Sequence, residues 1–263
     1  MRIVLGFFGL TRSLRLTAHA IVTNILAPLQ EAGWDMGRVG HFNLPARITN
    51  PRSGERGIVP DRREASLLDL DLCWIERQDE AAIAAQFDLA TAFPDAFGDS
   101  YASLRNLCHQ LRSLDRLWSL VGLLDPAPDD LFAFLRPDLL YLDRLDVAAT
   151  LLPLRRGECD LVVPSWQGWG GINDRFAFAN ARAAPIYATR WRRFADGCLT
   201  MGGMHAERFL DFAVRSADLR TRGTGLRAAR MRANGGIAAN DAPMVADTLS
   251  AGRGRSPRPA HGG

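Results

Sequence analysis

Three aspartates follow an apolar run in the segment RPDLLYLDRLD, residues 136–146. Asp138 comes directly after the run at 131–135, whereas Asp143 and Asp146 lie beyond a second apolar stretch. In open α/β sheets, ligands bind at the carboxyl ends of the strands. A carboxylate there could hold Mg²⁺ or Mn²⁺ against a phosphate, since hard cations prefer oxygen ligands. The spacing alone also fits acids that only solvate a turn. We expect Asp138 to be functional, and Asp143 and Asp146 to solvate the strand end.

A second segment, WQGWGGINDR at residues 166–175, combines aromatic, glycine and polar residues. Glycines let a backbone approach a ligand closely, and tryptophan faces are platforms for sugars. Asn and Arg side chains recognise hydroxyl and phosphate groups. A glycine-rich turn with core tryptophans is the alternative. The candidate substrate-binding residues are Trp166, Trp169, Gly170, Gly171, Asn173 and Arg175.

A third motif, MHAE at residues 204–207, precedes an apolar helical pattern. Glu207 would then lie in a first helical turn, where a carboxylate is favourable for the helix dipole alone. On a functional interpretation, Glu207 is a general base, and His205 is its neighbour or a metal ligand.

Composition excludes several kinds of chemistry. All 32 residues counted as Lys or Arg are arginine, so Schiff-base lysines and phosphate-loop lysines are absent. The net charge is only +3, which argues against a nucleic-acid binder. The four cysteines have no C-x-x-C spacing. No apolar run is long enough for a membrane span, so we expect a cytoplasmic protein.

Hydrophobic periodicity predicts an α/β domain over residues 1–240, with a basic, low-complexity and disordered tail at 241–263. Strands are predicted at residues 3–8, 37–42, 70–75, 131–135 and 161–163. Helices are predicted at 18–29, 101–121, 179–194 and 205–214, the third of them kinked or broken near Pro185, and a long flexible loop at 45–63. The strands 3–8, 131–135 and 161–163 should be neighbours in one sheet. The loop GLTRS, Asp138 and residues 170–174 should then meet in one cleft.

Taken in order, FFGLTRS, FLRPDLLYLD, VVPSWQGWGGINDRFAFAN, MHAE and ARMRANG resemble a family of bacterial polysaccharide glycosyltransferases of GT-A type, related to WavE-like lipopolysaccharide synthesis proteins. The resemblance covers about residues 1–236, and its hallmarks are R-P-D-L, G-G-x-N-D-R-F and H-x-E. It implies a GT-A-like, Rossmann-like mixed sheet with helices on both faces in a single domain.

The resemblance implies roles on the side of the donor. Asp138, with His205 as a further ligand, would hold a divalent cation, Mn²⁺ or Mg²⁺, that bridges the diphosphate of a nucleotide-sugar. In GT-A enzymes this motif often has the form D-x-D, with a second acid two residues before the metal-binding one. Arg136 occupies that position here, and could itself neutralise the diphosphate. Thr11 and Arg12 would meet the nucleotide.

The resemblance also implies the function. Residues 170–174 would meet the donor sugar and the acceptor, which makes Asp174 a catalytic candidate. Glu207 would deprotonate the acceptor hydroxyl. The expected activity is transfer of a sugar from a nucleotide-sugar to a saccharide or lipid-linked acceptor in surface polysaccharide synthesis, with inversion and a divalent cation. The resemblance is compatible with peripheral association with a membrane. The alternative is a non-catalytic nucleotide- or glycan-binding module on the same fold.

Overall fold

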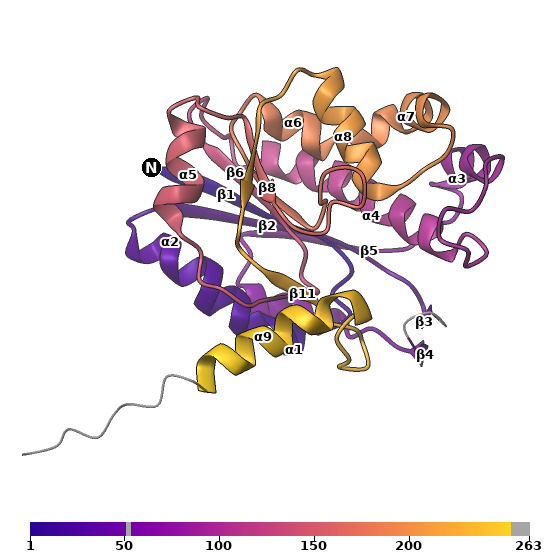
Figure 1. The fold of residues 1–263 in the computed structure, drawn as a ribbon, viewed down its shortest axis with the longest axis horizontal. Helices are drawn as coiled ribbons and strands as arrows, with labels where there is room; N and C mark the ends of the chain where they lie inside the picture. The colour runs from indigo at the N-terminus through magenta and orange to yellow at the C-terminus, as the bar shows by residue number, and fades with distance from the viewer. Residues whose placement is uncertain (51–53, 254–263) are drawn as a thin grey trace, which may run out of the picture.

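A computed structural model of the chain describes residues 1–50 and 54–253. Its centre is a seven-stranded sheet of order β10-β8-β9-β6-β1-β2-β5 (Figure 1). Strand β9 runs antiparallel to β6 and β8, and the other neighbouring pairs are parallel. The strands of this sheet are β1 (Arg2–Gly9), β2 (Asp35–Leu44), β5 (Leu72–Arg77), β6 (Leu131–Leu135), β8 (Leu161–Pro164), β9 (Phe176–Ala179) and β10 (Thr221–Thr224). Two antiparallel pairs lie outside it: β3 (Ile48–Asn50) with β4 (Glu55–Ile58), and β7 (Leu139–Tyr141) with β11 (Ala228–Arg230).

Helices cover both faces of the sheet (Figure 1). One face is covered by α1 (Leu14–Ile21), the π-helix η1 (Val22–Leu26), α2 (Ala27–Glu31) and α5 (Val147–Arg155). The other is covered by α4 (Ala102–Gly122), α6 (Ala183–Ala188) and α8 (Ala206–Ser216). The remaining helical segments are α3 (Ala84–Thr91), α7 (Phe194–Met201), α9 (Ala242–Arg253) and the 3₁₀ turns η3 (Arg62–Leu68), η4 (Arg190–Arg193) and η5 (Ala239–Asp241). Within the described ranges, no helix is long and apolar enough to cross a membrane.

The first strand shows why two cores form. Side chains alternate across a strand, so successive residues pack on opposite faces of the sheet. Ile3, Leu5 and Phe7 belong to the core beneath α1 and α5. Val4 and Phe8 belong to the core beneath α4 and α6. An unbroken apolar run is therefore what a strand between two helical layers requires.

The structure confirms the α/β class and the mixed sheet with helices on both faces. The predicted strands at 3–8, 37–42, 70–75, 131–135 and 161–163 correspond to β1, β2, β5, β6 and β8. The predicted helix at 179–194 begins too early, because Ala179 is the last residue of β9 and the first helix of this stretch, α6, starts at Ala183. Strand β9 lies between β6 and β8, so those two predicted strands are not direct neighbours. A four-residue apolar run does not distinguish strand from helix by periodicity.

The predicted disordered tail begins too early. Asp241 is fully buried, and α9 continues to Arg253; residues 254–263 lie outside the described part of the chain. The Asp241 carboxylate accepts a hydrogen bond from Arg175 Nη2 (2.7 Å) and another from the backbone N–H of Arg230 (2.8 Å). Polar contacts therefore anchor the start of this segment. The hydrophobic pattern of the sequence does not predict such contacts. Within the predicted loop 45–63, β3 and β4 form a hairpin, and residues 51–53 are not described.

Asp241→Ala should lower the melting temperature, because Arg175, whose side chain is 4% exposed, loses its carboxylate partner. Removing one partner of a buried ion pair costs about 3–5 kcal/mol. Thermal melting followed by circular dichroism measures the effect. Asp247→Ala, at an exposed position on α9, is the control and should melt like the parent protein. A chain truncated after Asn240 should melt as early as Asp241→Ala; an unchanged melting temperature would show that the segment contributes nothing.

Candidate active site

A pocket of about 500 Å³ opens at one edge of the sheet. Strands β1 and β6 are parallel, so their carboxyl ends meet at this edge. Strand β9 is antiparallel, and its first residue, Phe176, pairs with Leu135 at the end of β6. The residues just before β9 therefore reach the same edge, and Asp174 lines the pocket together with Arg12 and Asp138. The sequence predicted that these three segments would meet.

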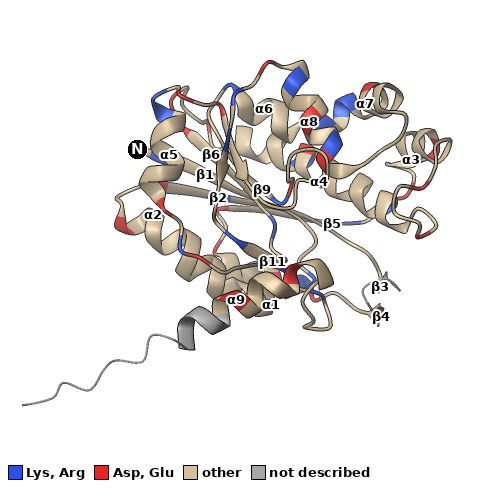
Figure 2. Ribbon diagram, in the orientation of Figure 1, with Lys and Arg blue, Asp and Glu red and all other residues tan. Residues whose placement is uncertain are grey.

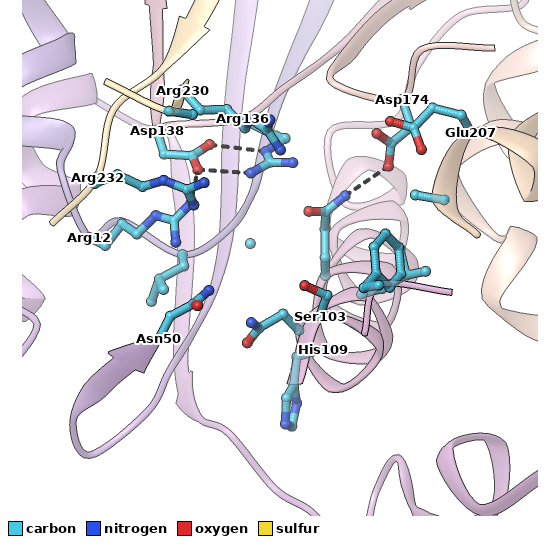
Figure 3. A pocket seen from close by; sticks show the side chains of 18 of the residues that line it. Arg12, Asn50, Ser103, His109, Arg136, Asp138, Asp174, Glu207, Arg230 and Arg232 are labelled. Atoms are coloured by element: carbon cyan, nitrogen blue, oxygen red, sulfur yellow. Dashed lines mark hydrogen bonds and ion pairs between the residues drawn. The ribbon is translucent and has the colours of Figure 1, made fainter. Parts of the chain in front are cut away.

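One side of the pocket carries four arginines (Figure 3). Arg12 follows β1, Arg136 follows β6, and Arg230 and Arg232 lie at and just beyond the end of β11. Asp138 lies among them. Arg136 donates from Nε to Asp138 Oδ1 (3.0 Å) and from Nη2 to Oδ2 (2.8 Å), and Arg12 Nη2 donates to Oδ2 (2.7 Å). Both oxygens of this buried carboxylate are thus held by guanidinium groups.

These contacts fix the charge of Asp138. Burial by itself would raise the pKa of the carboxyl group, but the charges and hydrogen bonds of Arg136 and Arg12 outweigh it. The net pKa of Asp138 is well below its usual range. The pKa of Arg136 is raised in turn: burial lowers it, and Asp138 more than compensates. Asp138 and Arg136 are therefore both ionised at neutral pH.

The other side of the pocket carries two carboxyl groups, Asp174 and Glu207 (Figure 3). Gln110 of α4 donates from Nε2 to Asp174 Oδ2 (3.2 Å), which fixes that carboxylate. Burial and the neighbouring charge of Asp174 raise the pKa of Glu207 to about 7. A backbone hydrogen bond, Arg230 and Arg175 act in the opposite direction. Near neutral pH, Glu207 is therefore poised between its acid and its base form.

His205 lies beside this pair. Its Nδ1 is 3.2 Å from Glu207 Oε2, but within the described residues the geometry of that contact is not a hydrogen bond. Its ring stacks on Phe97, with centroids 5.3 Å apart. Burial lowers the pKa of His205. His205 is thus neutral at pH 7 and adds little positive charge to oppose the raised pKa of Glu207.

Two glycines set the position of Glu207. The backbone N–H of Ile172 donates to the carbonyl of Glu207 (3.0 Å), so the loop before β9 packs on the first turn of α8. A Cβ on Gly171 would lie 2.3 Å from that carbonyl oxygen, so no larger residue fits without movement of α8. Gly170 has φ +80°, a conformation that glycine adopts readily. Gly171 thus supports the carboxyl pair through its contact with α8, and neither glycine lines the pocket.

The other predicted substrate-binding residues divide into two groups. Trp169 lines the pocket and is 54% exposed, and its φ of +45° marks a strained backbone. Trp166, Asn173 and Arg175 brace the loop instead. The Trp166 indole N–H donates to Leu226 O (3.0 Å), Asn173 Nδ2 donates to Trp166 O (2.7 Å), and the Arg175 guanidinium lies 4.8 Å from the Trp166 ring centroid. Thr11 is buried and is not among the residues that line the pocket.

The two later aspartates have structural roles. Asp143 accepts hydrogen bonds from the backbone and the guanidinium of Arg227 at 2.6–2.9 Å. Asp146 Oδ1 accepts from the backbone N–H of Ala149 (2.9 Å) and so caps α5. The prediction that both mostly solvate a strand end is wrong, because each accepts specific hydrogen bonds.

The pocket residues that were not predicted from the sequence include Gln110, Arg230 and Arg232. The alternation R-M-R in the motif ARMRANG could have indicated the two arginines, since residues two apart on an extended chain share a face. Nothing local distinguishes Gln110 from other polar residues on α4.

The residues present do not fit a divalent cation held by the chain. Both oxygens of Asp138 already accept hydrogen bonds from arginines. In residues 1–50 and 54–253, no group of three or more His, Cys, Asp or Glu side chains is placed to hold a metal ion. Neither Asp138 nor His205 belongs to such a group in these ranges, and metal binding by the two together stays a prediction.

Comparisons with known proteins found no matching family model and no matching curated protein. Among solved structures, the chain is similar to apo mouse xyloside xylosyltransferase 1 (13% identity, 85% of each chain covered, TM-score 0.36). It is also similar to the galactosyltransferase LgtC with donor and acceptor sugar analogs (12%, 84% of this chain and 71% of that chain, 0.35). A putative glucose-1-phosphate thymidylyltransferase from Bacillus anthracis, in complex with sucrose, matches at 8% identity over 98% of each chain, TM-score 0.44. Similarities this weak carry no inference, and the resemblance to WavE-like proteins stays a prediction.

The raised pKa of Glu207 should appear in the stability of the protein. Between the ordinary pKa of 4.5 and the folded value of about 7, the folded state keeps a proton that the unfolded state loses. Stability therefore falls as pH rises through this window. Glu207→Gln lacks the effect, so its melting temperature should rise relative to the parent protein from pH 4.5 to 7, by the equivalent of about 1–3 kcal/mol. Glu158→Gln, at an exposed position, is the control. A difference that stays constant with pH would contradict the raised pKa.

Proposed function

We propose that this chain is a glycosyltransferase that moves a sugar from a nucleotide-sugar donor to a hydroxyl group of a saccharide or lipid-linked acceptor. One observation carries the proposal. A single pocket holds a guanidinium cluster on one side and, on the other, a carboxylic acid whose pKa is near neutrality (Figure 3). The guanidinium cluster suits the binding of an anionic leaving group. The carboxyl group suits the role of proton acceptor.

The arginine side accounts for donor binding. Guanidinium groups bind phosphate oxygens with charge-assisted and often bidentate hydrogen bonds. Arg12, Arg136 and Arg232 line this side, and their positions are fixed by β1, β6 and the segment after β11. The negative charge that develops on a departing diphosphate would be stabilised by groups already in place, which lowers the barrier without reorganisation.

The carboxyl side accounts for activation of the acceptor. The acceptor oxygen forms a bond to the anomeric carbon while the bond from that carbon to the diphosphate oxygen breaks. The electron pair leaves with the diphosphate, and the hydroxyl proton passes to Glu207. Because the proton acceptor and the anion site lie on different sides of the pocket, a single displacement with inversion fits the arrangement (Figure 3).

Asp174 supports this step in two ways. Its negative charge raises the pKa of Glu207, which makes Glu207 a stronger base when ionised. It is itself fixed by Gln110 and could accept a hydrogen bond from a second acceptor hydroxyl. Trp169 is exposed beside these groups and offers an apolar face for a sugar ring. A role in surface polysaccharide synthesis, in the cytoplasm, is a further part of the proposal.

Incubation with a panel of UDP-, GDP-, dTDP- and CMP-sugars tests the activity. Release of free nucleotide, faster with added saccharide acceptors, would support transfer. Binding of a nucleotide-sugar without any release would instead identify a non-catalytic binding module on the same fold, and would overturn the proposal.

Glu207→Gln should reduce kcat by about 10²–10⁴-fold, because the amide cannot accept the acceptor proton. Binding of the donor nucleotide should change little, since Glu207 lies on the carboxyl side of the pocket. Steady-state kinetics and calorimetry separate these two quantities. Glu158→Gln removes an exposed carboxylate and should leave kcat at the parent value. A Glu207→Gln protein with full kcat would exclude Glu207 as the base.

The pH profile gives an independent check. The base must be ionised, so kcat/KM should rise with pH through the pKa of Glu207, about 7 in the free protein. The groups that face Glu207 are Asp174, His205, Arg175 and Arg230. Asp174→Asn removes the charge that raises this pKa, and should move the acid limb to lower pH. If the acid limb of the kcat/KM profile lies near pH 4.5 in the parent protein, the pKa of Glu207 is not raised and this prediction is wrong.

A further inference from the structure

The arginine cluster carries more positive charge than its own acids neutralise. Arg12 contacts Asp138 (2.7 Å) and Glu55 (3.6 Å), and Arg136 contacts Asp138. Arg175 and Arg230 both contact Asp241, at 2.7 and 3.4 Å. The four pocket arginines, Arg12, Arg136, Arg230 and Arg232, thus have three carboxylates among them, and one of these, Asp241, is also paired with Arg175 outside the pocket. The cluster is thus positively charged where it meets the pocket.

Arg232 is the clearest source of that charge. No described residue forms a side-chain hydrogen bond or an ion pair with it, and its Nε is buried without an acceptor. Burial, Arg12 and Arg230 lower its pKa to about 10, so it remains charged at neutral pH. Figure 3 shows its side chain beside Arg12 and Asp138. A half-buried guanidinium held among other cations is unfavourable unless an anion joins it.

A divalent cation is a poor candidate for the ligand that binds beside Arg232. A metal bound to Asp138 would have to displace Arg12 and Arg136 from the carboxylate oxygens, or lie beside them. A divalent ion in either place would be repelled by the positive charges of both guanidinium groups. The same geometry attracts a group with two or more negative charges.

We infer that guanidinium groups take the place of a divalent cation in this site. Arg12, Arg136 and Arg232 bind the diphosphate of the donor, and Asp138 is a positioning residue that orients Arg12 and Arg136. The inference rests on the proposed function for the identity of the ligand. It departs from the metal-assisted mechanism that the sequence resemblance implies.

Inorganic pyrophosphate is the probe, because it carries the diphosphate charge without a base or a sugar. Calorimetric titration is done in EDTA and again in excess Mg²⁺. Pyrophosphate should bind in EDTA, and Arg232→Gln should weaken binding about 10- to 100-fold, the loss expected for a charge-assisted hydrogen bond. Arg232→Lys should recover part of the affinity. Arg156→Gln removes one exposed charge outside the pocket and should bind as the parent protein does.

Asp138→Asn separates positioning from metal binding. If Asp138 orients arginines, the substitution should change pyrophosphate affinity by the same factor in EDTA and in Mg²⁺. A change seen only in Mg²⁺ would identify Asp138 as a metal ligand and overturn the inference. So would pyrophosphate binding that requires Mg²⁺, or an Arg232→Gln protein of unchanged affinity. Circular dichroism melts confirm that each variant is folded.

The result is independent of sugar transfer. If the chain releases no nucleotide from any sugar donor, yet binds pyrophosphate in EDTA through Arg232, the proposed function fails and the metal-free anion site stands. If sugar is transferred only when Mg²⁺ or Mn²⁺ is present, the function stands and this inference fails.

Discussion

Two guanidinium groups share the buried carboxylate of Asp138, and this ion pair joins parts of the chain that are far apart in sequence. Arg12 comes from the loop after β1, and Arg136 and Asp138 come from the end of β6. The backbone carbonyl of Asp138 also accepts a hydrogen bond from Met231 (2.8 Å), which brings the segment that carries Arg230 and Arg232 to the same place. A carboxylate buried this deeply is tolerated only because it is fully paired. The arginine side of the pocket is organised around it.

The opposite side is organised by a different constraint, the close contact of two backbones. Gly171 allows the loop before β9 to lie against the first turn of α8, and the Ile172–Glu207 hydrogen bond fixes the contact. Asp174 and Glu207 thereby become neighbours in a partly buried environment, and two carboxyl groups so placed resist being ionised together. The pocket thus separates a permanently charged cationic side from an anionic side that titrates near neutrality (Figure 3).

Ion pairs are a general means of holding this molecule together. Positive and negative residues are distributed over the whole described chain (Figure 2). Asp160 is paired with Arg220 and Arg182, Asp143 with Arg227, and Asp241 with Arg175. The basic partner in each of these pairs is an arginine, whose planar guanidinium can bind a carboxylate through two parallel hydrogen bonds. Arg232 has no such ion pair with a described residue, and it lines the pocket beside Arg12 and Asp138 (Figure 3).

The sequence by itself determined the parts that depend on local pattern. Apolar runs located β1, β2, β5, β6 and β8, amphipathic spacing located α4 and α8, and position after a strand selected Asp138 and Asp174 as residues of one site. Tertiary structure decided the rest. Strand β9 is short and apolar, and only its pairing with β6 and β8 makes it a strand. Arg12 proved to be a partner of Asp138, and Asp241 proved to be buried beside Arg175, because these two ion pairs join residues more than 100 and more than 60 positions apart. Contacts at such separations leave no periodic signal in a single sequence, since they depend on where the folded backbone brings each charge.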